Sequence, residues 1–165
     1  MKRKSQPSSN LNPDSHQQIN PSFLLASEPI SGQRGNGLFE VLFNSPLYGI
    51  ALTDMQGYFL QCNALFLSMT GYSMEDLLGK TSWDITPKKC IEGERGAVRE
   101  QIQTRGYSNL FEKEYICKDG RILPVDIVVL ANKNEKGEPV SAWGFVRDIS
   151  YRQQRQEEME RRMQE

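Results

Sequence analysis

The chain has 165 residues, of which 38% are hydrophobic and 25% are charged, and its formal net charge is −1. This composition is typical of one soluble globular domain with extensions, and the near-zero charge gives no electrostatic reason to expect a nucleic acid or an anionic membrane as partner. No apolar run is long enough to cross a bilayer, and no apolar segment follows the basic first residues, so we expect a cytoplasmic protein.

The character of the chain changes near Leu38. Residues 1–36 are rich in Ser, Asn, Gln and Pro and carry too few apolar side chains to offset the entropy of ordering, which predicts a disordered polar leader. From Leu38 to Phe43 the chain is very apolar, which predicts a short flanking helix, within residues 37–46, that ends before Pro46. A helix of this composition has to be covered by another surface.

A hairpin and two short helices are predicted next. The stretch "GIALTDMQGYFLQCN" contains two strand-like runs joined by a turn with Asp54 first and Gly57 fourth, as a type I turn prefers. Asn63 then caps a short helix over "ALFLSMT". Ser73 and Asp76 have the spacing of a capping box, which predicts a second helix of a single turn.

A longer helix is predicted from Thr86 and Pro87, a good cap and first position, to about Arg105, with Gly106 as the stop.

The last third predicts an antiparallel meander of three strands, "YSNLFEKEYICK", "RILPVDIVVLAN" and "VSAWGFVRD", with a turn at Asp119-Gly120. Both faces of the middle strand are partly apolar, so each needs a cover. Pro124 predicts a bulge or a strand start at its position.

The carboxyl end turns from an aromatic strand into a polar helix former within a few residues. Apolar and polar residues at alternating steps of three and four predict a weak coiled-coil seam. The seam consists of Ile149, Arg152, Gln156, Met159 and Met163. This segment is either a short parallel helix pair in a dimer or a frayed tail.

Residues that carry catalysis or bind metals are scarce. Cys62, Cys90 and Cys117 lack C-x-x-C spacing, which argues against a disulfide framework or a zinc site and favours reduced structural thiols. The only histidine, His16, lies in the polar leader. Without a histidine base, a phosphate loop or a metal-ligand cluster, we expect this chain not to be an enzyme.

Four short motifs carry a family resemblance. In chain order they are Asn63 after the second strand, Gly71-Tyr72-Ser73, Lys118-Asp119-Gly120 and Arg147-Asp148-Ile149-Ser150. With the order of elements, they make residues 38 to 155 resemble the PAS sensory domain of bacterial-type signal transduction proteins. The resemblance implies an α+β fold in which a five-stranded antiparallel sheet carries short helices on one face, enclosing a small pocket, with an N-terminal helix and a C-terminal signalling helix.

The expected organisation has four segments. They are a polar leader at residues 1–36, a flanking helix at 37–46, a PAS sensory domain at 47–149 and the start of a coiled-coil signalling helix at 150–165.

The residues disfavour two cofactors found in similar domains, and the cofactor stays unknown. Aligning "GKTSWDIT" with the light-sensing LOV branch places Ser82 where the photoreactive cysteine would be, and a hydroxyl cannot form the flavin adduct. The polar residues that would hold the flavin ring are missing too. Haem sensing usually relies on a histidine that residues 87–105 lack, and Cys90 or Met69 more often packs in a core than ligates iron.

Apolar and aromatic residues predict a pocket lining that suits a small apolar or aromatic ligand with one or two polar handles. The same residues also suit a core filled by side chains. The candidates are Ile50, Leu52, Leu60, Phe66, Met69, Trp83, Ile85, Val98, Ile102, Tyr115, Trp143 and Phe145.

Two further groups of residues have expected roles. In the family, the motif matching Arg147, Asp148 and Ile149 relays the state of the sensor from the last strand to an exit helix. A surface ion pair is the alternative for the first two. The residues with an expected structural role are Asp54, Asn63, Asp119 and Gly120.

The resemblance implies a sensory module that binds a small ligand and relays the signal to a downstream output domain. A histidine kinase, a nucleotide cyclase or a transcription activator would each fit as that domain. We expect a homodimer formed through the N-terminal helix and the C-terminal coiled coil, with neither nucleic acid nor membrane as partner. The alternative is a ligand-free module for protein interaction and dimerisation.

Overall fold

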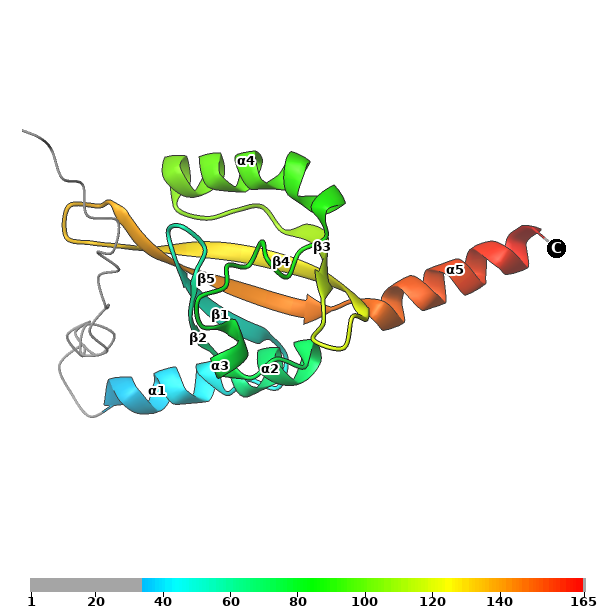
Figure 1. Cartoon of the computed structure of the whole chain (residues 1–165), viewed down its shortest axis with the longest axis horizontal. Helices are drawn as coiled ribbons and strands as arrows, with labels where there is room; N and C mark the ends of the chain where they lie inside the picture. Colours follow the sequence, from blue (N-terminus) through cyan, green and yellow to red (C-terminus); the bar gives the residue numbers. More distant parts are fainter. Residues whose placement is uncertain (1–33, 165) are drawn as a thin grey trace, which may run out of the picture. The chain divides into compact units, whose positions relative to one another are not determined.

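The computed structural model describes residues 34–164, so residues 1–33 of the predicted polar leader lie outside the described residues. The chain divides into two compact units, Met1–Leu38 and Phe39–Glu165. The described residues of the first unit form the beginning of helix α1 (Arg34–Phe43), which starts earlier than the flanking segment expected at 37–46. The elements after α1 belong to the second unit (Figure 1).

Five strands form one antiparallel sheet with the order β2-β1-β5-β4-β3, which confirms the predicted fold class. The last strand of the sequence therefore lies at the centre of the sheet, between the first strand and the meander. The strands are β1 (Gly49–Asp54), β2 (Phe59–Cys62), β3 (Phe111–Ile116), β4 (Ile122–Lys133) and β5 (Pro139–Asp148).

Strand β4 passes through Pro124 without a bulge, so the prediction of a bulge or strand start there is wrong. Pro124 lies in register with Glu114 of β3. Its carbonyl accepts the N–H of Ile149 at 3.1 Å, and the N and O of one strand residue point to the same side. The nitrogen of Pro124, which carries no hydrogen, therefore faces the end of β5. The last residue pair between β4 and β5 there is Val125 with Asp148, so Pro124 lies just beyond this ladder.

Two short helices, α2 (Ala64–Thr70) and α3 (Met74–Leu77), follow β2 and have the predicted caps. The side chain of Asn63 accepts the N–H of Phe66, and Ser73 and Asp76 form the capping box. Gly71 ends α2 with φ at 77°, a left-handed conformation that glycine adopts without steric cost. Local side-chain to backbone bonds thus set both helix starts.

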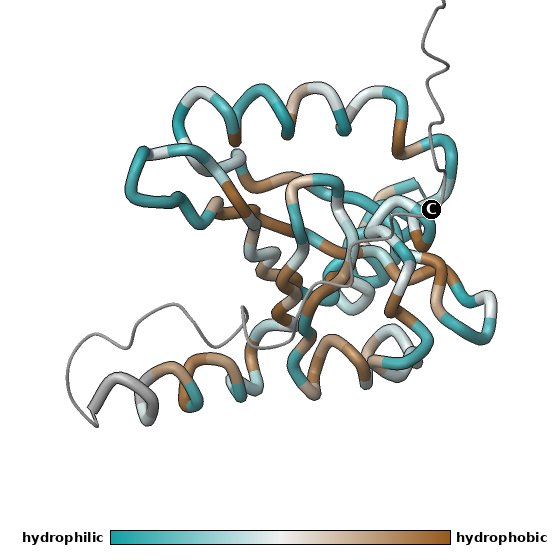
Figure 2. Tube along the Cα trace, turned by 60° about the vertical axis from the view of Figure 1, so that its left-hand side comes forward, coloured by the Kyte–Doolittle hydropathy of each residue, from teal (hydrophilic) through white to brown (hydrophobic). Residues whose placement is uncertain are grey.

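The longer helix α4 (Lys88–Arg105) begins later than predicted. Pro87 occupies the cap position without a side-chain bond, and the hydroxyl of Thr86 donates to the carbonyl of Ser82 at 2.7 Å. Thr86 therefore stabilises the preceding turn, and the prediction that it caps the helix is wrong. Figure 2 shows that α4 is hydrophilic over most of its length.

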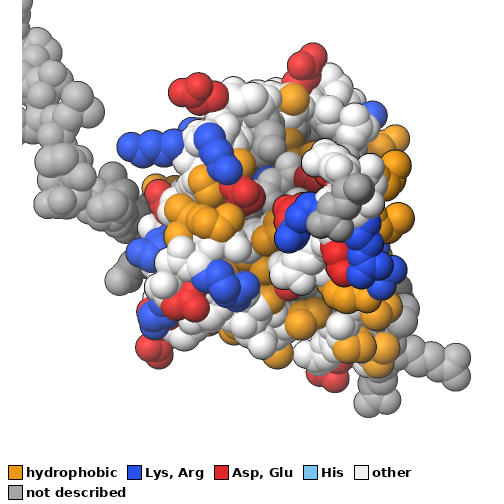
Figure 3. All heavy atoms as spheres, turned by 90° about the vertical axis from the view of Figure 1, so that its right-hand side faces the viewer, with side chains coloured by type: hydrophobic (Ala, Val, Ile, Leu, Met, Phe, Trp, Pro, Cys, Tyr) orange, Lys and Arg blue, Asp and Glu red, His pale blue; other side chains and the backbone are white. Residues whose placement is uncertain are grey.

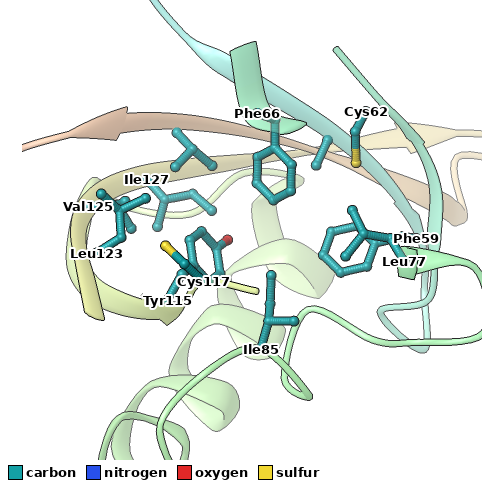
Figure 4. Packing of buried hydrophobic residues seen from close by; sticks show 12 residues of the cluster. Phe59, Cys62, Phe66, Leu77, Ile85, Tyr115, Cys117, Leu123, Val125 and Ile127 are labelled. Carbon is teal, nitrogen blue, oxygen red and sulfur yellow. The ribbon is translucent and has the colours of Figure 1, made fainter. Parts of the chain in front are cut away.

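The core lies between one face of the sheet, called the inner face, and the short helices (Figure 4). Phe66 of α2 contacts Phe59 of β2 and Tyr115 of β3, with both pairs of ring centroids 5.8 Å apart. Leu77 of α3 and Ile85 of the following loop are also buried in this cluster.

The opposite, outer face of the sheet is also apolar, and the second half of α1 covers part of it. Ile50 and Leu52 of β1 are buried there, in register with Phe145 and Trp143 of β5. The rings of Phe39 and Phe43 in α1 lie 6.0 and 6.2 Å from that of Trp143. The sheet thus covers one side of the flanking helix, while Val41 and Leu42 on the helix remain exposed.

Candidate functional site

A cavity of about 260 Å³ lies between the inner face of the sheet and helix α4. Its floor is made by small residues on the neighbouring strands β1 and β5, where Ala51 is in register with Gly144 and Thr53 with Ala142. The side chains of Val98 and Ile102 on α4 form the opposite wall. The cavity exists because adjacent small side chains leave space that no neighbour fills.

The structure places four of the twelve predicted pocket residues in the cavity wall, namely Trp83, Val98, Ile102 and Tyr115. For the residues of β1 and β5 the predicted face was wrong, because large side chains were taken to point inward. Side chains alternate along a strand, so the small neighbours face the cavity and the large ones lie on the outer face. The outer-face residues are Ile50, Leu52, Trp143 and Phe145.

The other four predicted residues also lie outside the cavity wall. Phe66 and Ile85 are buried in the core cluster, and Met69 packs against that cluster. Leu60 follows Phe59 on β2, and it is Phe59 that lines the cavity. The register of β1 and β2 slips between Leu52 and Thr53, which pairs Thr53 with Phe59 on the inner face.

Positive charge gathers at the cavity, which the sequence prediction missed. Lys113 lies on the inner face of β3 and is only 6% exposed. Its Nζ is 4.7 Å from the ring centroids of both Trp83 and Tyr115, within the range of a cation–π interaction. Arg95 and Arg99 of α4 also line the cavity. The alternation in "FEKEYI" places Lys113 on the face of Tyr115, but the prediction considered only apolar residues.

The turn between β1 and β2 closes one end of the cavity, since Asp54 to Gly57 belong to its lining. One carboxylate oxygen of Asp54 accepts the N–H groups of Gln56 and Tyr58, both at 2.9 Å. The carbonyl of Gly57 accepts the N–H of Ser82 at 2.9 Å, which links the turn to the loop that carries Trp83.

Asn63 is 1% exposed and connects three elements. Its Oδ1 accepts the N–H of Ile50 at 2.8 Å in addition to that of Phe66 at 2.9 Å. Its Nδ2 donates to the carbonyl of Phe43 at 2.8 Å and to that of Tyr48 at 2.9 Å. This side chain therefore fixes the end of α1 and β1 as well as capping α2.

The turn between β3 and β4 contains the other two residues with an expected structural role. A carboxylate oxygen of Asp119 accepts the N–H of Arg121 at 2.9 Å, and Gly120 has φ at 85°.

The junction between β5 and the exit helix α5 (Ser150–Gln164) carries the predicted relay residues. Arg147 bonds both carboxylate oxygens of Asp126, at 3.2 and 2.5 Å, and hydrogen bonding to this carboxylate raises the pKa of Arg147. Asp148 accepts the N–H of Ser150 at 2.8 Å, and Ile149 is buried. Asp126, on the outer face of β4 and 2% exposed, was not predicted as part of this junction.

The first turn of α5 is tied to the sheet, while the rest of the helix is exposed. Arg152 pairs with Glu112 of β3 and lies 4.0 Å from Asp126. Within the predicted coiled-coil seam, the domain itself thus engages Ile149 and Arg152. Met159 and Met163 are exposed. On the face from which α5 projects, acidic and basic side chains are interspersed (Figure 3).

The three cysteines all lie in the described part of the chain, and none forms a disulfide. Burial raises the pKa of Cys62 to about 12 and also raises that of Cys117, so both remain thiols at neutral pH. Cys90 lies at the start of α4, with its Sγ 4.0 Å from a carboxylate oxygen of Glu114, and it does not line the cavity.

Residues 34–164 contain no helix long and apolar enough to span a membrane. They also contain no group of three or more His, Cys, Asp or Glu residues arranged to hold a metal ion.

Two curated proteins show which kind of protein contains a similar segment. The chain is 24% identical to the sensor histidine kinase TmoS of Ectopseudomonas mendocina over 91% of its own length and 15% of that protein. It is 30% identical to the hybrid signal transduction protein dokA of Dictyostelium discoideum over 70% of its own length and 7% of that protein. The chain thus spans a small part of each relative.

Solved structures of similar fold include a PAS domain from Colwellia psychrerythraea, with a TM-score of 0.65 and 23% identity, covering 70% of this chain and 98% of that one. An RNA-binding light-oxygen-voltage receptor also has a TM-score of 0.65, with 17% identity, covering 99% of this chain and 42% of that one. The family model described as "PAS domain" matches residues 47–150. The chain therefore belongs to the PAS domain family, a family of sensory modules.

Proposed function

We propose that this chain is the sensory part of a larger signal transduction protein, that it binds a small ligand in the inner cavity, and that it relays the bound state through α5 to an output domain. The observation that carries the proposal is the position of β5. Ala142, Gly144 and Val146 of this strand line the cavity, and the same strand runs into α5 at Ser150. A ligand that favours one position of β5 would thereby shift the packing of the exit helix.

The junction of β5 and α5 supports the relay. Asp126 holds Arg147 on β5 and lies close to Arg152 on α5, so a small displacement of β5 would redistribute the contacts of one buried carboxylate. The two curated relatives are signalling proteins, which favours a histidine kinase over a nucleotide cyclase or a transcription activator as the output domain. In this proposal the chain itself catalyses no reaction. A cytoplasmic location is part of the proposal, supported by three cysteines without disulfides.

The ligand in this proposal is neither haem nor a LOV-type flavin. Ser82 lines the cavity and offers a hydroxyl where adduct formation needs a thiol. Cys90 and Met69, the residues weighed as haem ligands, lie outside the cavity wall.

Native mass spectrometry of the purified chain, compared with its mass after denaturation, tests the proposal. We expect a non-covalent mass bound to the native chain. This mass should disappear in the variant Ala142→Leu, which extends a side chain into the cavity, and persist in Ala97→Leu, the same change at an exposed position of α4. Ligand sensing is refuted if every preparation is bare protein and if no compound in a ligand screen binds Ala142→Leu and Ala97→Leu differently.

Exposed apolar side chains favour the second candidate, a ligand-free module for protein interaction and dimerisation. Val41 and Leu42 on α1 and Leu47 after it are 60–70% exposed, beside the aromatic cluster on the outer face of the sheet. A homodimer through α1, extended by Met159 and Met163 of α5, would bury these residues. Dimers without a bound mass in the same experiment would support this candidate.

A further inference from the structure

A row of charged side chains crosses the outer face of the sheet beside the start of α5. Glu112 of β3 is in register with Asp126 of β4, which is in register with Arg147 of β5. Two acids opposite each other on neighbouring strands repel. Arg147 bonds both carboxylate oxygens of Asp126 and so stabilises one of the two acids. The strands thus bring two negative groups and one positive group together in this row.

Arg152 in the first turn of α5 completes the row. Its guanidinium bonds the carboxylate of Glu112 and lies 4.0 Å from a carboxylate oxygen of Asp126. The ion pair farther along α5, between Arg162 and Glu158, lies within the helix. An exposed ion pair contributes little alone, but Arg152 also faces Asp126, whose side chain is 3% exposed and whose charge is screened less by salt. The first turn of α5 therefore docks on this row through Arg152.

Strand β3 connects the row to the cavity. Side chains alternate along a strand, so Glu112 points to the outer face from between Phe111 and Lys113, which line the cavity. Among the described strands, β3 lies at the edge of the sheet and pairs with β4, whereas β5 pairs with both β1 and β4. A shift of β3 therefore disturbs one ladder of backbone hydrogen bonds, and a shift of β5 disturbs two.

The next outer-face residue of β3 contacts a different helix. Glu114 pairs with Lys89 of α4 at 2.7 Å, while Glu112 pairs with Arg152 of α5. We propose that Glu112 is a second relay residue, which transmits a shift of β3 at the cavity to α5 through Arg152, beside the route through β5. This inference rests on the proposed sensory function and adds a positioning residue to it.

Amide hydrogen exchange of the full chain, followed by NMR, tests the role of Glu112. The reporter is the N–H of Gln153, which donates to the carbonyl of Ile149 at 3.0 Å at the start of α5. Glu112→Gln keeps the size of the side chain and removes its charge, and it should speed this exchange about threefold, as expected for an exposed ion pair. Glu114→Gln is the matched control and should leave the exchange unchanged. In about 1 M sodium chloride, where the Debye length is about 3 Å, the effect of Glu112→Gln should fall by about half or more.

A variant that fills the cavity tests the connection between the cavity and α5. Val98 lines the cavity from α4, whereas its neighbour Ala97 is exposed. Val98→Phe should change the exchange of the Gln153 N–H, and Ala97→Phe should not. In a Glu112→Gln background the effect of Val98→Phe should fall by about half or more, because the ion pair between β3 and α5 is absent; the difference between the two backgrounds measures the coupling.

Equal exchange of the Gln153 N–H in Glu112→Gln and Glu114→Gln would overturn this inference, and this comparison requires no cavity variant to fold. An effect of Val98→Phe that is as large in the Glu112→Gln background as in the parent would overturn it too, as would no effect in the parent. These failures remain distinct from failure of the proposed function, because native mass spectrometry reports independently on whether the cavity holds a ligand.

Discussion

The substitution Asn63→Asp changes one atom of a buried side chain and has an effect that the structure allows us to estimate. The Oδ1 of Asn63 accepts two N–H groups and can continue to do so in aspartate. Its Nδ2 donates to the carbonyls of Phe43 and Tyr48, and these would instead face a carboxylate oxygen. Leaving a buried carbonyl unsatisfied costs about 1–2 kcal/mol, so Asn63→Asp should lower the free energy of unfolding by about 2–4 kcal/mol at neutral pH.

The same substitution should make stability depend on pH in a defined direction. A protonated carboxyl can donate to one of the two carbonyls, so folding favours the neutral form and raises the pKa of the new group above its unfolded value. A group of this kind contributes stability below its unfolded pKa, and the contribution is lost as pH rises through the folded pKa. The deficit relative to the parent should therefore be smaller at about pH 4 than at about pH 8.

Urea unfolding followed by circular dichroism at both pH values measures these deficits. Asn63→Ala is the matched control, because it leaves four backbone groups without a partner, about 4–8 kcal/mol in total at the same cost per group, and has no group that titrates. An Asn63→Asp chain as stable as the parent at the higher pH would refute the reasoning. An equal deficit at both pH values would do so as well.

Three further predictions concern the exit helix, two glycines and one ion pair. Asp126→Asn should speed amide hydrogen exchange in the first turn of α5 and leave the exchange of β1 unchanged, because it weakens the contacts that hold the junction of β5 and α5. If α5 exchanges at the same rate in the variant and the parent, Ile149 alone anchors the helix. Gly96→Ala, in the middle of α4 with open space at the Cβ position, should raise the free energy of unfolding by about 0.5–1 kcal/mol. Gly79→Ala, at φ 80°, should lower it by about 1 kcal/mol. Calorimetry measures both changes, and a change of the opposite sign in either variant would contradict the prediction. Hydrogen bonding to Lys118 and Ser73 lowers the pKa of Asp76 to about 2, so the contribution of Asp76 to stability is lost as pH falls from about 4 towards 2. Lys118→Met should raise the pKa of Asp76 in an NMR titration. An unchanged pKa would show that the capping box alone sets it.

Local features of the fold were predictable because their causes are local in sequence. Asn63 at the start of α2 and the pair Ser73 and Asp76 at the start of α3 act through bonds to residues within one turn. The bonds from Asn63 to Phe43 and Tyr48 join residues 15 to 20 positions apart, and no pattern around Asn63 indicates them. The role of Asp126 was hidden for the same reason.

The cavity was only partly predictable, because both faces of the sheet are covered. Where one face meets water, apolar residues mark the inner side, but in "SAWGF" the apolar residues on the outer face are larger than those on the inner one. The useful pattern is that Ala142 and Gly144, separated by Trp143, are too small to fill a core. A prediction based on size as well as hydropathy would have found the floor of the cavity, and one that considered charged residues on the inner face would have found Lys113.

The central place of β5 also has a consequence for the order in which the protein is made. Strand β1 pairs with β5 across about ninety positions of sequence, from Gly49 to Val146 and from Asp54 to Ser141. Until those last residues leave the ribosome, the hairpin of β1 and β2 and the hairpin of β3 and β4 each present an open strand edge. Such edges template misfolded pairing. The sheet can therefore close only after β5, the strand that joins both hairpins, has been synthesised. Before that, the edges of β1 and β4 that β5 later covers are open to pairing with other chains.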